Sequence, residues 1–283
     1  MREFWNLFRQ NRGALAGLIL VATVSVIALL APLLAPYEPS AFFENALKLP
    51  PFWSAGSDPL YLLGTDDLGR DLLSRLIYGS RVSLGIGFFV VLFNCFFGLL
   101  LGLLAGSLGG WIDAVIMRLM DILLALPSIL LAIVVVAILG PSLINTVLAV
   151  GIITLPNVVR VVRASVMVEK KKTYVVASQS FGANWFRIFI INVLPNCAAP
   201  LLIQASFGFS DGILNAAALG FLGLGAQPPI PEWGTMLSDA RAYIESAAWL
   251  VTLPGICILL VVIGFNLLGD GLRDALDPKV KRA

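Results

Sequence analysis

Long apolar runs restrict the fold of this chain more than any other feature. The first, Leu15–Leu34, contains no charged residue. A helix that crosses the hydrocarbon core of a bilayer needs about 20 consecutive apolar residues. We interpret this run as a retained helix rather than a cleaved signal peptide, because the Ala-Pro-Tyr-Glu-Pro that follows it is a poor cleavage site. Five more runs follow: Val82–Leu108, Ile122–Leu139 (extended back through Met117 and containing Pro127), Leu143–Val159, Val193–Ser210 and Trp249–Leu268. The sequence therefore predicts an all-α polytopic membrane protein with six transmembrane helices.

The scarcity of charge excludes several classes of protein. Charged residues make up 13% of the chain, against about 25% in soluble domains, so the whole surface cannot face water. A net charge of +2 argues against nucleic-acid binding. The chain has no His, and Cys95, Cys197 and Cys257 show no CxxC spacing, so no metal site is predicted. No Lys follows a Gly, which excludes a nucleotide-binding P-loop, and no catalysis is predicted.

The basic residues of the loops predict the orientation, because cytoplasmic loops are enriched in Lys and Arg. They concentrate before the first span, between the fourth and fifth spans, and in the tail, which lie on one side if there are six spans. These residues are Arg2, Arg9, Arg12, Arg160, Arg163, Lys170, Lys171, Lys172, Arg187, Arg273, Lys279, Lys281 and Arg282. Both termini are therefore predicted to be cytoplasmic. The predicted units are 1–36 (N-terminus and first span), 37–81 (external segment) and 82–283 (five spans, a cytoplasmic loop at 164–192 and a cytoplasmic tail).

The loop at 164–192 predicts a helix–turn–helix knuckle. Thr173 can cap a short helix over Tyr174–Phe181. Gly182 can end that helix in a left-handed turn, and Asn184 can cap a second helix that enters the fifth span. The alternative is an amphipathic loop that rests on lipid head groups. Small side chains near the turn would let another protein approach closely: Ala177, Ser178 and Gly182.

The two predicted external segments, before the second span and before the sixth, each contain a pattern that predicts a helix. Thr65 or Asp66 is predicted to cap a helix before the second span. Arg70 and Asp71 could pair with charges of a neighbouring chain, or could belong to a self-contained surface helix. Apolar residues at helical spacing between Glu232 and Trp249 predict a short amphipathic helix at the membrane interface, with Trp233, Met236, Leu237, Ala240, Tyr243 and Ile244 on one face.

The knuckle carries a family resemblance. Tyr174-Val-Val-Ala-Ser178, Gly182-Ala183 and Ile188 through Leu194-Pro195 resemble the EAA loop of ABC-importer permeases. In that family the loop docks as a coupling helix into a groove of the ATPase subunit. Val176 stands at the position where the family has Glu, and Ser178 where it has a second Ala. A contact of that Glu with the ATPase is therefore not expected here, and the small residues and the glycine are expected to contact the ATPase instead. The resemblance implies an ATPase-coupling loop that contains Tyr174, Ala177, Ser178, Gly182, Ala183, Asn184, Ile188, Leu194 and Pro195.

Two further stretches narrow the resemblance. Leu63 through Arg75 resembles the segment before span two in the dipeptide/oligopeptide/nickel permease subfamily. Ala217–Pro229, Pro231–Met236 and Gly269–Pro278 resemble the C-type permeases of dipeptide importers. The signature residues of the first stretch are expected to have a structural and inter-subunit role: Gly64, Thr65, Asp66, Gly69, Arg70, Asp71 and Arg75.

This resemblance implies a type I ABC-importer permease fold and a non-catalytic subunit of the inner membrane, with 37–81 in the periplasm. The implied partners are a homologous permease, two cytoplasmic ABC ATPases that carry ATP and Mg, and a periplasmic peptide-binding protein. Dipeptides or short peptides would cross by alternating access. Nickel, glutathione or another small solute is the alternative cargo. A self-sufficient secondary transporter, which would need inverted repeats and intramembrane ion ligands, and a structural membrane protein are the other classes considered.

Charged residues inside the apolar runs are predicted to be paired or to lie on the pathway. Asp121 follows Arg118 by one helical turn, so the two can pair on one helix face. Asp211 follows the apolar run Val193–Ser210. If this run is one helix, it is roughly 27 Å long, nearly the thickness of the hydrocarbon core, so Asp211 would lie at the outer interface. If the helix continues through Ala217, Asp211 instead lies deeper and lines the pathway, where it could attract a peptide amino group.

Overall fold

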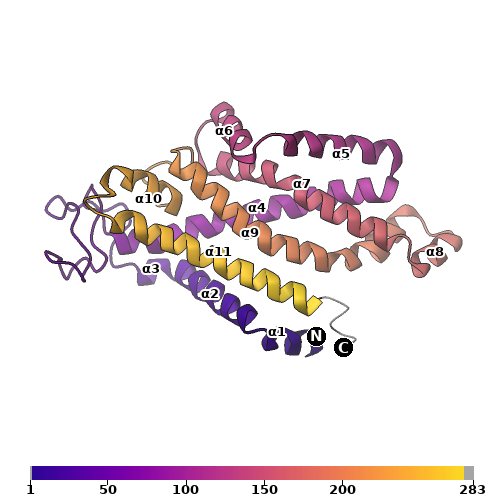
Figure 1. The fold of residues 1–283 in the computed structure, drawn as a ribbon, viewed down its shortest axis with the longest axis horizontal. Helices are drawn as coiled ribbons and strands as arrows, with labels where there is room; N and C mark the ends of the chain where they lie inside the picture. The colour runs from indigo at the N-terminus through magenta and orange to yellow at the C-terminus, as the bar shows by residue number, and fades with distance from the viewer. Residues whose placement is uncertain (1, 277–283) are drawn as a thin grey trace.

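Long helices run side by side along the longest axis of the molecule (Figure 1). The structure is a computed structural model that describes residues 2–276, and this part of the chain contains no β-strand. The prediction of an all-α chain is confirmed. The α-helices are α1 Arg2–Gln10, α2 Arg12–Leu29, α3 Ala31–Leu34, α4 Leu72–Leu108, α5 Gly110–Ala125, α6 Ser128–Leu139, α7 Leu143–Glu169, α8 Thr173–Ser180, α9 Ala198–Phe221, α10 Trp233–Ala240 and α11 Trp249–Leu276.

Five helical segments of residues 2–276 are long and apolar enough to cross a membrane: Arg12–Leu29, Leu72–Leu108, Leu143–Glu169, Arg187–Phe221 and Trp249–Leu276. A sixth crossing needs α5 and α6 together, and these two helices are bent by 95° at the break between them. The prediction of one continuous helix through Pro127 is wrong. Leu126 is extended (φ −93°, ψ 142°), as expected for a residue before proline, and Pro127 has no N–H to continue the helical ladder.

The segment before α9 is helical but irregular. A π-helix over Arg187–Val193 and a 3-10 helix over Leu194–Cys197 lead into α9. Pro195 lies in this transition, where its missing N–H interrupts the regular hydrogen bonding. The predicted fifth span ended at Ser210, whereas α9 runs to Phe221. Asp211 is therefore enclosed within a helix rather than placed at its end.

Helix α4 begins earlier than the sequence suggested. Asp71 caps it by accepting hydrogen bonds from the backbone N–H (2.8 Å) and the hydroxyl (2.6 Å) of Ser74. The expectation that Thr65 or Asp66 caps this helix is therefore wrong, and α4 includes residues 72–81, which precede the apolar run. With 37 residues, α4 is about 55 Å long, which exceeds the roughly 30 Å hydrocarbon core.

Glycines allow α4 and α7 to pack closely. Gly98, Gly102 and Gly106 recur every four residues along α4, and a Cβ on each would meet Val158, Val162 and Val166 of α7, respectively. Small residues at this spacing let two helices approach within a membrane, where van der Waals packing drives association. The pairing makes α4 and α7 the central unit of the bundle, with α9 packed against both.

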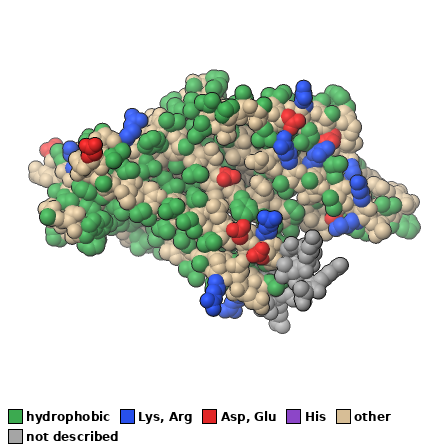
Figure 2. Space-filling view, viewed as in Figure 1, with side chains coloured by type: hydrophobic (Ala, Val, Ile, Leu, Met, Phe, Trp, Pro, Cys, Tyr) green, Lys and Arg blue, Asp and Glu red, His purple; other side chains and the backbone are tan. Residues whose placement is uncertain are grey.

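The two ends of the bundle differ in charge. One end, called here the α10 end, carries residues 35–71 and α10, and the other, the α8 end, carries α8 (Figure 1). Lys and Arg side chains gather toward the α8 end (Figure 2). The predicted basic tail residues Lys279, Lys281 and Arg282 lie outside the described residues.

Candidate functional site

The knuckle at the α8 end has the predicted turn but not the predicted first cap. Gly182 follows α8 with φ +77°, the left-handed conformation that favours glycine. The Asn184 side chain accepts a hydrogen bond from the Arg187 backbone N–H at 2.9 Å, so the predicted cap of the second helix is confirmed. Lys172, not Thr173, occupies the N-cap position of α8 and makes no side-chain cap. The expected Thr173 cap is wrong because Thr173 is already the first helical residue.

A buried carboxylate fastens the knuckle to the end of α7. Glu169 accepts a hydrogen bond from the Tyr174 hydroxyl (2.5 Å) and pairs with the Lys172 ammonium (2.7 Å). The Asn196 side chain donates to the Tyr174 oxygen at 3.1 Å. Burial, followed by the hydrogen bond to Glu169, raises the pKa of Tyr174 to about 12. The phenol therefore stays protonated and continues to donate to Glu169 at physiological pH.

The knuckle has an apolar anchor and an exposed apolar rim. Val175 is fully buried and packs with Ile188, Phe189, Val193 and the α7 valines. The predicted coupling residue Ile188 thus belongs to the anchor rather than to a contact surface. The other predicted residues lie on or near the surface: Tyr174, Ala177, Gly182, Asn184 and Pro195 are exposed, and Ser178, Ala183 and Leu194 are half-buried.

Large apolar side chains form the rim. Phe181 is 92% exposed, and Val176, Trp185 and Phe186 are also exposed. Phe181 immediately precedes the left-handed Gly182, so the turn projects it away from the anchor. These four exposed side chains lie close together in the sequence, within residues 176–186. The sequence singled out the small residues of this knuckle but missed the aromatic ones.

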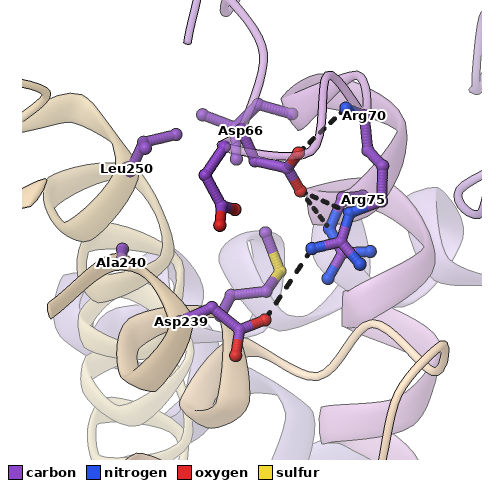
Figure 3. Close-up of a pocket in the computed structure, with 9 residues that line it drawn as sticks. Asp66, Arg70, Arg75, Asp239, Ala240 and Leu250 are labelled. Atoms are coloured by element: carbon purple, nitrogen blue, oxygen red, sulfur yellow. Dashed lines mark hydrogen bonds and ion pairs between the residues drawn. The ribbon is translucent and has the colours of Figure 1, made fainter. Parts of the chain in front are cut away.

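At the α10 end, an ion-pair cluster joins the segment before α4 to α10 (Figure 3). Asp66 contacts Arg70 at 2.5 Å and Arg75 at 3.5 Å, and Arg70 reaches Asp239 of α10 at 3.8 Å. Asp66, Arg70 and Arg75 are buried. Within this chain, Arg70 is held by Asp66 and Asp239, and Asp71 caps α4. A pairing of these residues with a neighbouring chain stays a prediction.

The rest of this signature folds the external segment on itself. The hydroxyl of the buried Thr65 accepts from the Leu49 N–H at 2.9 Å and donates to the Ala46 carbonyl. Gly64 and Gly69 have φ of +82° and +77°, and a Cβ on either would collide with a backbone carbonyl oxygen. These glycines are therefore required by the close backbone approach. The expected structural role of the signature agrees with these intrachain contacts.

The predicted short helix is present as α10, but it ends at Ala240, before Tyr243 and Ile244, and the start of its apolar face packs against the rest of the chain. Trp233 is 1% exposed, and its indole N–H donates to the Leu76 carbonyl of α4 at 3.1 Å. Met236 and Ala240 are also buried. The helix packs its apolar face onto α4, α9 and α11. These three helices are far from α10 in the sequence or separated from it by loops, so its own apolar pattern does not reveal them.

Glu232 fixes the start of α10. Its carboxylate accepts from the Gly234 and Thr235 backbone N–H groups at 2.8 and 2.9 Å. The Ser83 hydroxyl of α4 lies 3.3 Å from the same carboxylate. Burial raises the pKa of Glu232 above its ordinary value of 4.5. The side chain thus caps α10 and connects it to α4.

We expect Glu232→Ala to lower the free energy of unfolding by about 1–3 kcal/mol, because it leaves buried donors without an acceptor. Glu232→Gln should cost less, since an amide oxygen can still accept. The folded chain binds the Glu232 proton more tightly than the unfolded chain, so stability should fall as the pH rises from 4.5 through the raised pKa. Glu232→Gln should remove this part of the pH dependence. Unfolding of the purified chain in detergent between pH 4 and 8 measures both effects, and identical pH profiles for the two proteins would contradict the assignment.

Ion pairs between α5 and α7 replace a pair predicted within one helix. Asp121 contacts Arg160 at 2.6 Å rather than Arg118. Asp113 binds Arg163 through two hydrogen bonds of 2.5 and 2.6 Å. Arg160 and Arg163 lie inside α7, which extends to Glu169, and not in the loop that follows it.

Asp211 lies on the exposed side of α9, ahead of the helix end at Phe221. It lines a small cavity between α4, α7 and α9 together with Asn94, Thr154 and Gln204. The sequence did not bring these residues together, because they come from three helices. Among residues 2–276, no group of three or more His, Cys, Asp or Glu is placed to hold a metal ion.

Comparison with known families gives two matches. Residues 98–282 match the family described as binding-protein-dependent transport system inner membrane component. Residues 1–51 match the N-terminal TM domain of oligopeptide transport permease C. The two matches leave residues 52–97 and the last residue uncovered, and each of them concerns transport proteins.

Curated relatives resemble the chain over its full length. It is 58% identical to the di/tripeptide transport system permease protein DppC of Pseudomonas aeruginosa, over 100% of this chain and 93% of that protein. It is 55% identical to the dipeptide transport system permease protein DppC of Haemophilus influenzae, over 100% of this chain and 96% of that protein. It is 44% identical to the glutathione transport system permease protein GsiD of Pectobacterium atrosepticum, over 99% of this chain and 91% of that protein.

A solved structure shares the fold. A chain of the MetNI methionine ABC transporter in an inward-facing conformation matches with a TM-score of 0.58 and 18% identity. The match covers 73% of this chain and 98% of the other. The predicted type I importer fold is confirmed by this likeness, which at such low identity concerns the fold alone.

Proposed function

We propose, because the chain belongs to the family of binding-protein-dependent inner-membrane transport components, that it is the permease subunit of an ATP-driven importer of dipeptides or short peptides. The observation that carries this proposal is the 55–58% identity to dipeptide and di/tripeptide permeases across the whole chain. Glutathione permeases are 42–44% identical. Glutathione is therefore the second candidate cargo, and it is itself a small peptide.

In this proposal the α8 end faces the cytoplasm and both termini lie on that side. The Lys and Arg side chains that gather toward the α8 end (Figure 2) support this orientation. The α10 end, with its folded external segment, then faces the periplasm. It is the side from which a peptide-binding protein would deliver the substrate.

The knuckle is the proposed docking element for the ATPase. Its rim of exposed aromatic side chains supports this role, because such groups are the residues that anchor protein interfaces. Its anchor connects the rim to α7 through Val175 and through the contact between Tyr174 and Glu169. A displacement of the knuckle by a docked ATPase would therefore be passed to the spanning helices.

In this proposal the chain forms part of the transport pathway and changes conformation, and partner subunits supply the free energy of ATP hydrolysis. With no Gly-Lys step in the sequence, ATP and Mg are assigned to two cytoplasmic ATPases. A homologous permease would complete the pathway against this chain. ATP binding would favour one of two conformations through its different affinity for them, which is the thermodynamic requirement for alternating access.

Uptake by the reconstituted complex tests the function. The chain, its partner permease, the two ATPases and the binding protein would be placed in liposomes and offered a dipeptide, a tripeptide, glutathione and nickel. We expect ATP-dependent accumulation of the dipeptide. Accumulation of glutathione without the dipeptide would favour the second candidate. Accumulation of nickel alone, or accumulation that continues without ATP, would contradict the proposal.

A further inference from the structure

A small polar cavity lies between three helices that are otherwise apolar. Asn94 and Cys95 of α4, Thr154 and Asn157 of α7, and Gln204 and Asp211 of α9 line it, with aliphatic side chains between them. About 10 Å³ is open to the centre of a water-sized group, which is close to the least that one such group needs. All three helices belong to segments long and apolar enough to span the membrane. Polar groups at such a place are expected to serve a pathway.

The side-chain oxygen of Asn94 accepts no hydrogen bond from the described residues. Asn94 is 3% exposed, and its side-chain N–H donates to the Thr154 hydroxyl oxygen at 2.6 Å. The Thr154 hydroxyl donates in turn to the Val150 carbonyl at 2.7 Å, so it can only accept from Asn94. This arrangement fixes the orientation of the amide. The Asn94 Oδ1 atom is left buried with no hydrogen-bond partner in the part of the chain that the structure describes.

Asp211 adds an uncompensated carboxylate to the same cavity. No Lys or Arg of residues 2–276 forms an ion pair with it, and no basic side chain lines the cavity. Asp211 is followed by ten more residues of α9, about 15 Å of helix, so it lies well inside this segment. The cavity therefore offers a carboxylate, and the buried Asn94 amide in its wall has an oxygen without a donor among residues 2–276. A complementary group must bring positive charge and N–H donors.

We propose that this cavity is the subsite that receives the terminal ammonium group of a peptide as it crosses the membrane. The proposal rests on the peptide importer function given above. An ammonium carries three donors, which match the Asp211 carboxylate and the amide side chains that line the cavity, those of Asn94, Asn157 and Gln204. The carboxylate end of a peptide does not fit, because it would face Asp211 with like charge. Only the ammonium enters the cavity, and the rest of the peptide lies outside it.

The thiol of Cys95 allows the charge preference of the cavity to be measured directly. In the assembled complex, with Cys197 and Cys257 replaced by Ser, Cys95 would be labelled with a small methanethiosulfonate that carries an ammonium group and with a neutral one. We expect the ammonium reagent to react faster than the neutral one. Asp211→Asn should reduce that preference by about tenfold, since a charged cleft concentrates counter-ions by this order or more. Asp211→Glu should retain it.

Uptake supplies the second measurement. Asp211→Asn and Asn94→Leu should each lower uptake of Ala-Ala in liposomes by about tenfold, through a raised KM. Asp270→Asn is the matched control: it makes the same change at an exposed residue of α11 that lies outside this cavity, and uptake should stay within about twofold. Unchanged uptake together with an unchanged labelling preference in Asp211→Asn would overturn the subsite. If the wild-type complex takes up no peptide, the importer function itself is contradicted, and the cavity loses its assignment with it.

Discussion

Replacing Phe181 by Asp is expected to abolish ATP-dependent uptake while the chain remains folded in the membrane. Phe181 is 92% exposed at the turn of the knuckle, so its removal should cost the isolated fold almost nothing. In an assembled complex, an aromatic anchor of this kind contributes about 2 kcal/mol or more when it is truncated. A loss of that size weakens association about thirtyfold, and a buried carboxylate adds a further penalty.

Co-purification of the ATPase subunits and uptake in liposomes measure the effect. Phe181→Leu keeps an apolar contact and should retain most of the association. Phe52→Asp is the matched control, because Phe52 is an exposed aromatic residue of the external segment, at the opposite end of the bundle. It should leave the ATPase subunits bound. Normal ATPase association in Phe181→Asp would show that the knuckle is not the docking element.

Replacing Gly102 by Ala should destroy the packing of α4 on α7, even though the change adds one methyl group. A Cβ at Gly102 would lie 2.6 Å from the Val162 Cβ and 2.9 Å from the Val159 carbonyl oxygen. The backbone oxygen cannot rotate away, so the helices must separate. Overpacking of this kind costs about 1–3 kcal/mol or more, and separation also loses the neighbouring contacts at Gly98 and Gly106.

Gly85→Ala is the matched control for this prediction, since Gly85 lies in the same helix and a Cβ there meets no atom within 4 Å. It should stabilise the chain by about 0.5–1 kcal/mol, because Ala favours the helix over Gly. Thermal unfolding in detergent and the yield of assembled complex would compare the two. The two variants should shift stability in opposite directions. Equal stability would mean that α4 and α7 do not approach as closely as the structure shows.

Local signals in the sequence were sufficient for most of the spanning segments, the third excepted, and for part of the knuckle. The lengths of the apolar runs gave the helices, and Gly182 and Asn184 were placed correctly because a left-handed turn and a cap depend on adjacent residues. The bend at Pro127 was missed because proline within a membrane helix is often tolerated, and neighbouring helices decide the outcome. The start of α4 was missed because Asp71 competes with several other capping residues nearby.

Contacts between segments far apart in the sequence could not be predicted in the same way. Asp121 has Arg118 one turn away, yet it pairs with Arg160 from another helix. Arg70 reaches Asp239, which lies far along the chain. The cavity around Asn94 depends on three helices and on the direction of one amide group. The spacing of residues within one segment does not reveal which residues of other segments lie beside them in the fold.

The firm attachment of the knuckle to α7 has a mechanical consequence. Helix α7 has 27 residues, about 40 Å, and Pro156 near its middle interrupts the backbone hydrogen bonding. The half from Pro156 to Glu169 is therefore the stiff part, about 20 Å long. Because Glu169 and Val175 hold the knuckle to one end of it, a tilt of about 5° imposed there moves the other end of this half by roughly 2 Å. The glycine contacts oblige α4 to follow. If the α8 end faces the cytoplasm as proposed, such a lever would pass a slight shift of the knuckle to the α4–α7 pair, because the glycine contacts all lie on the stiff half of α7.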